Sequence, residues 1–202
     1  PAFSLKASTI EPPIEELFKD KVVICPVHRF KGADRESYGM MHRAFCEKLN
    51  EKYPNKKVVL GLLFPADEFL AQYINDIPNY DSSFDLFRHH PNEIISMFAQ
   101  ADSLISSRLH GSILASIVET NICPIIYDVK VKNFSQLLGI ENLASEFGDG
   151  ITWSKTQDSG YDLFEKYEQS HHDNSNNYQK NLFALIEKSK QQAANLKAAL
   201  EL

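Results

Sequence analysis

Short apolar runs alternate with segments of helical periodicity between residues 22 and 139. Val22-Val23-Ile24-Cys25 is apolar at every position, which is typical of a strand covered on both faces. The strands predicted from such runs are 22–25, 57–63, 102–105 and 123–127, with 83–87 as an ambiguous fifth. The helices predicted from apolar spacing are 36–53, 65–77, 91–101, 112–120 and 134–138. Alternation of this kind predicts an α/β fold with a doubly wound parallel sheet.

The two ends of the chain depart from this alternation. Residues 1–20 contain three prolines and few periodic apolar positions, which favours a linker. The run from His171 to Asn177 is polar throughout, and a helical pattern with one apolar side follows it. We therefore expect a linker over 1–20, one domain over 21–170, and a polar linker with a C-terminal helix over 171–202.

Composition narrows the classes of partner and compartment. The net charge is -6, with 27 acidic and 21 basic residues and no long basic block, which argues against a nucleic-acid partner. No apolar stretch approaches the length of a membrane span and no signal pattern opens the chain, so we expect a soluble cytoplasmic protein. The cysteines Cys25, Cys46 and Cys123 are odd in number and scattered, which predicts buried free thiols in a reducing compartment.

The polar stretch from Ser106 to Ser112 lies where the predicted central strand passes into a helix. Open α/β sheets bind ligands beyond the carboxyl ends of their strands, and the free N–H groups of a following helix favour an anion. Arg108 would supply a fixed cation there, and His110 a group that exchanges a proton near neutral pH.

Polar clusters follow three of the predicted strands. They are His28 with Arg29, Arg108 with His110, and Asp128 with Lys130. Because parallel strands end at the same edge of a sheet, we expect these side chains to converge on one cleft. Several cations with one carboxylate and imidazole groups suit a small anion that carries phosphate and carboxylate groups.

Each of these residues also has a purely structural interpretation. Arg108 could pair with a carboxylate such as Asp102 or Asp128, and His110 could pack at the start of a helix. Ser107 and Ser112 could be plain helix caps, and Lys130 could be solvated.

Other kinds of site have little support in the sequence. His171-His172-Asp173 lies in the polar run without supporting ligands, so we expect no metal site. The chain contains no G-x-G-x-x-G, no P-loop and no G-x-S-x-G, which argues against a nucleotide cofactor of those kinds.

The stretch from about Glu93 to Ile140 resembles the C-terminal half of the polysaccharide pyruvyl transferase family. The residues that carry the resemblance are Ala101-Asp102, Ser106-Ser107-Arg108-Leu109-His110, Pro124-Ile125-Ile126-Tyr127-Asp128, Lys130, Phe134 and Leu138-Gly139. Pro1-Ala2-Phe3 also resembles the end of the Asp-Pro-Ala segment that precedes this half in the family.

The resemblance implies two Rossmann-like domains that face a cleft, as in GT-B glycosyltransferases. This chain would then hold only the C-terminal, donor-binding domain, and the N-terminal domain would be missing. Phosphoenolpyruvate would be the donor and a saccharide with two hydroxyl groups the acceptor, with no separate cofactor. The product would be a pyruvate ketal on a cell-surface polysaccharide or its precursor.

The resemblance also implies roles for single residues. His110 would be the general acid, and Arg108 would grip a carboxylate or phosphate group. The family often has an arginine at the end of the first strand, where this chain has Val27-His28-Arg29. The other residues expected to bind the substrate are His28 or Arg29, Ser107, Gly111, Ser112, Asp128 and Lys130.

Two other functions fit the same pattern. The domain could belong to a GT-B glycosyltransferase that binds a nucleotide sugar, and competition between nucleotide sugar and phosphoenolpyruvate would separate the two. It could also be a non-catalytic binding or assembly module, which a native gene encoding only these residues would favour.

Overall fold

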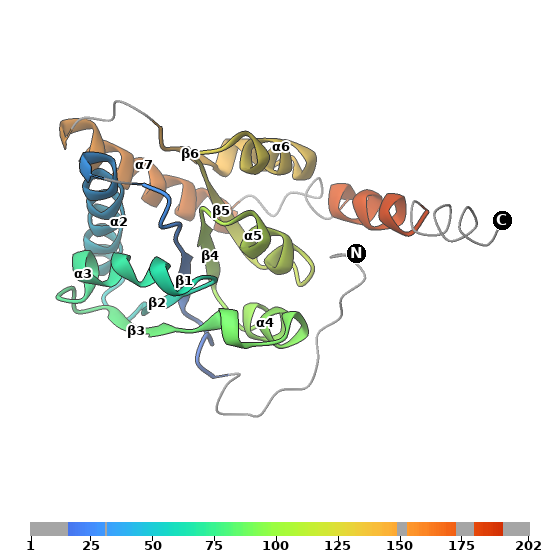
Figure 1. The fold of residues 1–202 in the computed structure, drawn as a ribbon, viewed down its shortest axis with the longest axis horizontal. Helices are drawn as coiled ribbons and strands as arrows, with labels where there is room; N and C mark the ends of the chain where they lie inside the picture. The colour runs from blue at the N-terminus through green and yellow to red at the C-terminus, as the bar shows by residue number, and fades with distance from the viewer. Residues whose placement is uncertain (1–15, 31, 149–152, 173–179, 192–202) are drawn as a thin grey trace.

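A six-stranded parallel sheet forms the centre of the computed structural model, which describes residues 16–30, 32–148, 153–172 and 180–191 (Figure 1). The strand order is β3-β2-β1-β4-β5-β6. The strands are β1 (Val22–Cys25), β2 (Val58–Gly61), β3 (Tyr80–Phe84), β4 (Ser103–Ser106), β5 (Asn121–Ile126) and β6 (Ser145–Glu146). All neighbouring strands run parallel, so the predicted sheet is confirmed.

Helices cover both faces of this sheet. The α-helices are α2 (Gly32–Lys52), α3 (Ala71–Ile74), α4 (Pro91–Phe98), α5 (Leu109–Ser116), α6 (Val129–Leu138) and α7 (Trp153–His172). Short 3₁₀ turns are η2 (Pro65–Leu70), η3 (Leu86–Arg88) and η4 (Glu141–Leu143). Helices α2, α3 and α7 pack on one face, and α4, α5 and α6 on the other (Figure 1). The sheet is therefore doubly wound, as the alternation predicts.

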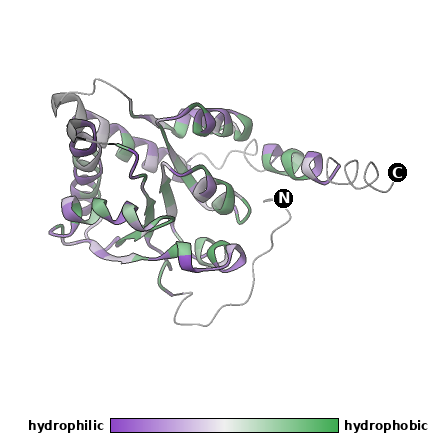
Figure 2. Ribbon diagram, in the orientation of Figure 1, coloured by the Kyte–Doolittle hydropathy of each residue, from purple (hydrophilic) through white to green (hydrophobic). Residues whose placement is uncertain are grey.

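The strands explain this two-sided packing. In β1, Val22 and Ile24 join the core beneath α2 and α7, while Val23 and Cys25 join the core beneath α4 and α5. Because successive side chains point to opposite faces, a strand buried on both faces reads as a continuous apolar run. Hydrophobic colour accordingly runs along the central strands, whereas the helices are two-sided (Figure 2).

Predicted boundaries at the edge strand β3 and at the helix after β4 were wrong. The strand predicted at 83–87 ends at Phe84, because Leu86 begins the turn η3 and buries its side chain there. The helix predicted from residue 112 begins at Leu109, so His110 lies in the first turn of α5 rather than in a loop. Apolar spacing missed this turn because Leu109 is followed by three polar or small residues, His110, Gly111 and Ser112.

The polar run from His171 is also corrected at its start. His171 and His172 belong to α7, and only residues 173–177 of the run lie outside the described part of the chain. The His171 Nε2 atom lies 3.0 Å from Ser103 Oγ and 3.4 Å from Asp102 Oδ2, which ties the end of α7 to the start of β4.

Asp102 is the centre of this second polar cluster. Lys56 Nζ lies 2.7 Å from Asp102 Oδ1, and the Tyr167 hydroxyl donates to Oδ2 at 3.1 Å. Burial alone would raise the pKa of the Asp102 carboxyl, but the hydrogen bonds from His171 and Lys56 outweigh it and hold the pKa below its usual range. The cluster lies at the amino end of β4, so it fastens the fold at the edge opposite the strand exits.

The helix at residues 180–191 packs on the face of α6. Leu182 is buried in that core, and Asn181 Nδ2 donates to the Leu138 carbonyl at 3.1 Å. Of the apolar side predicted for the C-terminal helix, Leu182, Leu185 and Ile186 therefore pack on this core, whereas Phe183 is 65% exposed.

Two further expectations concern the state of the cysteines and the presence of a membrane-spanning helix. Cys25, Cys46 and Cys123 are all buried and free, as predicted. Over the described ranges, no helix combines the length and apolarity needed to cross a membrane.

The buried side chain of His42 should make the protein less stable in acid. It is fully buried in α2 and neither ring nitrogen has a hydrogen-bond partner among the described residues, so burial lowers its pKa to about 3. At a pH between this value and the ordinary pKa of 6.5, His42 binds a proton in the unfolded chain but not in the native chain. The contribution of neutral His42 to the free energy of unfolding is therefore fully present above the ordinary pKa and is lost on acidification. Within this window the unfolding equilibrium constant rises about tenfold for each pH unit of acidification.

We expect His42→Leu to lose less stability than the wild type when the pH falls from neutral into this window. Urea unfolding at several pH values measures the difference. His172→Leu, at an exposed position of α7, is the matched control and should keep the wild-type pH dependence. Parallel pH profiles for wild type and His42→Leu would contradict the assignment.

Candidate functional site

The strand order reverses between β1 and β4, because the chain first builds β2 and β3 on one side and then β4 to β6 on the other. Cys25 pairs with Ser106, so β1 and β4 end at the same level, and β5 runs past them from Pro124 to Ile126 at the same edge of the sheet. Ligands of doubly wound sheets bind in the crevice at such a reversal. The polar residues that follow these three strands therefore surround the position where a ligand is expected.

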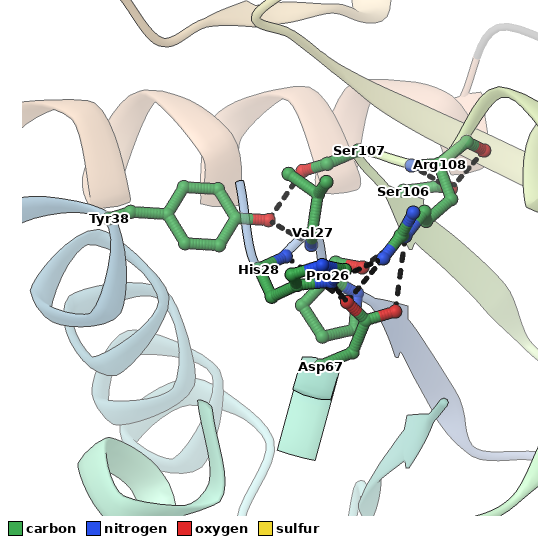
Figure 3. A network of polar contacts seen from close by, with 8 residues as sticks. All are labelled: Pro26, Val27, His28, Tyr38, Asp67, Ser106, Ser107 and Arg108. Carbon is green, nitrogen blue, oxygen red and sulfur yellow. Dashed lines mark hydrogen bonds and ion pairs between the residues drawn. The ribbon is translucent and has the colours of Figure 1, made fainter. Parts of the chain in front are cut away.

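Asp67 is the centre of the polar network at this point (Figure 3). Its side chain is 0% exposed, and it lies in η2, beyond the end of β2. Arg108 Nε donates to Oδ2 at 3.1 Å and Arg108 Nη2 donates to Oδ1. The alternative that Arg108 pairs with a carboxylate is thus confirmed, but the partner is Asp67 and neither of the two candidates named for it, Asp102 and Asp128.

Arg108 uses only one edge of its guanidinium group in this pairing. Nε and Nη2 face Asp67, and Nε also donates to the Pro26 carbonyl at 3.1 Å. Nη1 has no partner within the described part of the chain, and the side chain is 23% exposed. The second edge, formed by Nη1 and Nη2, can therefore receive a carboxylate or phosphate in two parallel hydrogen bonds.

His28 is held by the same carboxylate. Its backbone N–H donates to Asp67 Oδ1 at 3.1 Å, its Nδ1 lies 2.8 Å from that oxygen, and its ring stacks on Phe64 with centroids 4.7 Å apart. Arg108 Nη2 lies 2.9 Å from the same Nδ1. We assign the proton to Nδ1, so that Nδ1 and Arg108 Nη2 are neighbouring donors to the same acceptor, Asp67 Oδ1. An unprotonated Nδ1 could accept from Nη2 but would set its lone pair against the buried carboxylate. Nε2 is then the nitrogen left to act on a ligand.

Ser107 forms an internal hydrogen bond. Its Oγ lies 2.5 Å from the Tyr38 hydroxyl of α2, which in turn accepts the Val27 N–H at 3.3 Å. Ser107 and Tyr38 are both fully buried, and burial raises the pKa of the Tyr38 phenol. The hydroxyl of Ser107 therefore joins α2 to the exits of β1 and β4.

Gly111 is needed for packing. A Cβ atom there would lie 3.0 Å from Ser106 Oγ and 3.3 Å from Leu63 Cδ1, so the first turn of α5 rests directly on the sheet. Ser106 Oγ holds the backbone of the turn, because it accepts the Arg108 N–H at 3.1 Å and lies 2.9 Å from the Arg108 carbonyl. The Ser112 hydroxyl is buried and has no partner among the described residues.

The third strand exit joins the first. Asp128 caps α6 by accepting the Lys130 backbone N–H at 2.8 Å, and its other oxygen accepts Arg29 Nη1 at 3.2 Å. Asp128 therefore orients the backbone of Lys130 rather than its amine. Lys130 and His110 are exposed. Contacts between His28 and Arg108, and between Arg29 and Asp128, thus confirm that the three exits share one edge.

A family model described as polysaccharide pyruvyl transferase matches residues 5–129. The chain belongs to this family. The match lies in the N-terminal part of the chain and includes β1, η2 and the first turn of α5. Pyruvyl transferase similarity thus covers Arg29, Asp67 and Asp128, and extends well before the stretch that begins at Glu93. Lys130 lies just outside the match.

Comparisons with individual proteins add less to the pyruvyl transferase assignment. No curated protein matches the chain. One solved structure that matches is WaaG, a glycosyltransferase involved in lipopolysaccharide biosynthesis, at 15% identity with a TM-score of 0.41. The match covers 91% of this chain and 52% of WaaG, so the chain spans about half the length of that protein.

Proposed function

We propose that this pyruvyl transferase domain takes part in moving the pyruvyl group of phosphoenolpyruvate onto two hydroxyl groups of a saccharide. The observation that carries the proposal is Arg108, which Asp67 fixes at the strand-order reversal with one edge of its guanidinium left for an anion. Family membership supports the reaction class. The facing domain implied by the family resemblance is part of the same proposal.

The proposed reaction needs an acid and a base. Protonation at C3 of phosphoenolpyruvate leaves an oxocarbenium-like centre at C2, which the first sugar hydroxyl attacks as it loses its proton. The C2–O bond to phosphate then breaks, and the phosphate takes the electron pair. The second hydroxyl attacks C2 and loses its proton, so that one hydroxyl proton balances the proton on C3 and the other leaves with phosphate.

The two histidines suit opposite ends of this chemistry. His110 is exposed in the first turn of α5 and is assigned the acid that protonates C3. His28 is assigned the base, because Asp67 fixes its Nδ1 and stabilises the imidazolium formed when Nε2 accepts a hydroxyl proton. This assignment changes the expectation that His28 only binds an anion.

Cations at the neighbouring exits complete the proposed donor site. Arg108 holds one anionic group of phosphoenolpyruvate through its free edge. Arg29 and Lys130 lie at the exits of β1 and β5, where both are exposed and able to hold the other anionic group. Phosphoenolpyruvate serves as substrate in this scheme, and no step requires a separate cofactor.

His110→Gln tests the acid assignment. We expect phosphate release from phosphoenolpyruvate in the presence of an acceptor to fall by about 10²–10⁴-fold, because glutamine cannot transfer a proton at C3. Binding of phosphoenolpyruvate, followed by calorimetric titration, should change little. His90→Gln, at an exposed position before α4, is the matched control and should keep wild-type turnover.

Near-normal phosphate release by His110→Gln would overturn the acid assignment. The same titration run with nucleotide sugars tests the whole proposal. Tight binding of a nucleotide sugar, with no response to phosphoenolpyruvate, would replace the proposed function by glycosyl transfer.

A further inference from the structure

A cavity of about 340 Å³ opens beside the candidate site, where β5 and β6 end. Its lining includes Tyr127, Asp128, Val129, Lys132, Glu146 and Phe147. This volume falls within the range of small-molecule sites, which run from about 300 to 1,000 Å³. None of the roles assigned above uses Tyr127, Val129, Lys132, Glu146 or Phe147.

The cavity borders the candidate donor site. Asp128 belongs to both, because it lines the cavity and accepts the hydrogen bond from Arg29. Tyr127 is the second link, since its ring contacts Phe30 edge-on at 5.7 Å between centroids. The cavity thus adjoins the residues that follow β1, through Arg29 and Phe30.

Charge makes the cavity unsuited to an anion. Of its two carboxylates, Asp128 pairs with Arg29 and Glu146 faces the ammonium of Lys132, so the charges balance and no cation is left in excess for an anion. Lys132 Nζ and Glu146 Oε1 are 3.9 Å apart, and the side chains are 51% and 75% exposed. This ion pair is therefore weak, and both groups can bind a ligand instead. An anionic donor is drawn to Arg108 instead, which leaves the cavity to a neutral ligand.

The lining matches the two kinds of surface that a sugar presents. Tyr127 and Val129 offer apolar surface to the C–H face of a pyranose ring, and the buried ring of Phe147 lies behind them in the core. Carboxylates accept hydrogen bonds from hydroxyl groups, and the ammonium of Lys132 donates to them. Both kinds of group line one open cavity at the same sheet edge as His28 and Arg108.

We propose that the cavity between the ends of β5 and β6 binds the saccharide acceptor as a neutral polyhydroxy ligand. The inference rests on the proposed function, because it places the second substrate of the same reaction. It assigns Tyr127, Glu146 and Lys132 to acceptor binding and leaves Arg108 to the donor.

Filling the cavity tests the inference. Val129 is 65% exposed in the lining at the start of α6, and Val129→Trp should occupy the cavity without disturbing the core. Leu137→Trp is the matched control, because Leu137 is 57% exposed on the same helix and does not line the cavity. The ligands are the methyl glycosides of galactose, glucose, mannose and N-acetylglucosamine, titrated into the full chain and followed by amide NMR. Phosphoenolpyruvate is titrated separately.

We expect at least one glycoside to shift the signals of Tyr127 and Glu146 in the wild type and in Leu137→Trp, and Val129→Trp to weaken this binding at least tenfold. Glycoside shifts elsewhere, equal binding by both variants, or no shift with any of the four would overturn the inference. Phosphoenolpyruvate should shift Arg108 and His28 equally in all three proteins. Failure of that response alone overturns the proposed function, while the glycoside results still decide whether the cavity binds sugars.

Discussion

Arg108→Lys is expected to weaken the binding of phosphoenolpyruvate by about 10-fold to 100-fold, the equivalent of losing a charge-assisted hydrogen bond worth about 1.5–3 kcal/mol. Arginine can pair with Asp67 through Nε and Nη2 while its Nη1 edge faces a ligand. A lysine ammonium is a single point charge and cannot serve both partners with parallel bonds. Calorimetric titration of the purified chain with phosphoenolpyruvate measures the difference.

Arg88→Lys is the control for this substitution. Arg88 also forms an arginine-carboxylate pair, with Asp85, but its side chain is 71% exposed in η3. We expect this variant to bind phosphoenolpyruvate as the wild type does. Unchanged binding by Arg108→Lys would show that the free edge of Arg108 does not face the donor.

Asp67→Ala is expected to lower the free energy of unfolding by about 3 kcal/mol, the lower end of the range for breaking a buried ion pair. The substitution removes the shared acceptor of Arg108, the His28 N–H and His28 Nδ1. The partial exposure of Arg108 and His28 lets water replace some of these bonds, which keeps the effect at that lower end. Urea unfolding at neutral pH measures it.

Asp67→Asn separates charge from size in the same experiment. Its amide would set N–H groups against donors, so we expect a loss of stability close to that of Asp67→Ala. Asp85→Ala removes an exposed carboxylate from the Arg88 pair and should cost less than about 1 kcal/mol. Equal, small losses at Asp67 and Asp85 would contradict a central role for the buried carboxylate.

Strand exits were the part of the candidate site that sequence could predict. Apolar runs located β1, β4 and β5, and polar residues directly after them had to meet because parallel strands end at one edge. The contacts of Arg108 with His28 and of Arg29 with Asp128 follow from this geometry. The catalytic and binding roles of these residues stay predictions, as does the division of the chain at residues 21 and 170.

Asp67 was missed although the same rule could have found it. It follows the strand predicted at 57–63, but the apolar spacing of Phe69, Leu70, Tyr73 and Ile74 predicts a helix there, and a polar position of such a helix gives no sign of burial. Burial of a charged residue depends on partners that lie far away in sequence, here 39 and 41 positions away. No local pattern reports such partners.

Tyr38 and His171 were beyond prediction for a related reason. Tyr38 lies on the apolar face of α2, where its ring gives the periodic signal, and only the packing of α2 on the sheet brings its hydroxyl to Ser107. His171 ends a helix whose last turn is polar, so its contact with Ser103 has no periodic signature.

The close seating of Gly111 on Ser106 and Leu63 gives the candidate site a stiff side. The first turn of α5 cannot move closer to the sheet, and the hydrogen bond to Asp67 fixes the Arg108 guanidinium. An incoming anion therefore meets donors that are already ordered, so little conformational entropy is lost on this side when it binds. Any adjustment of shape on binding falls to the ligand and to the exposed side chains around it, such as Lys130 and His110.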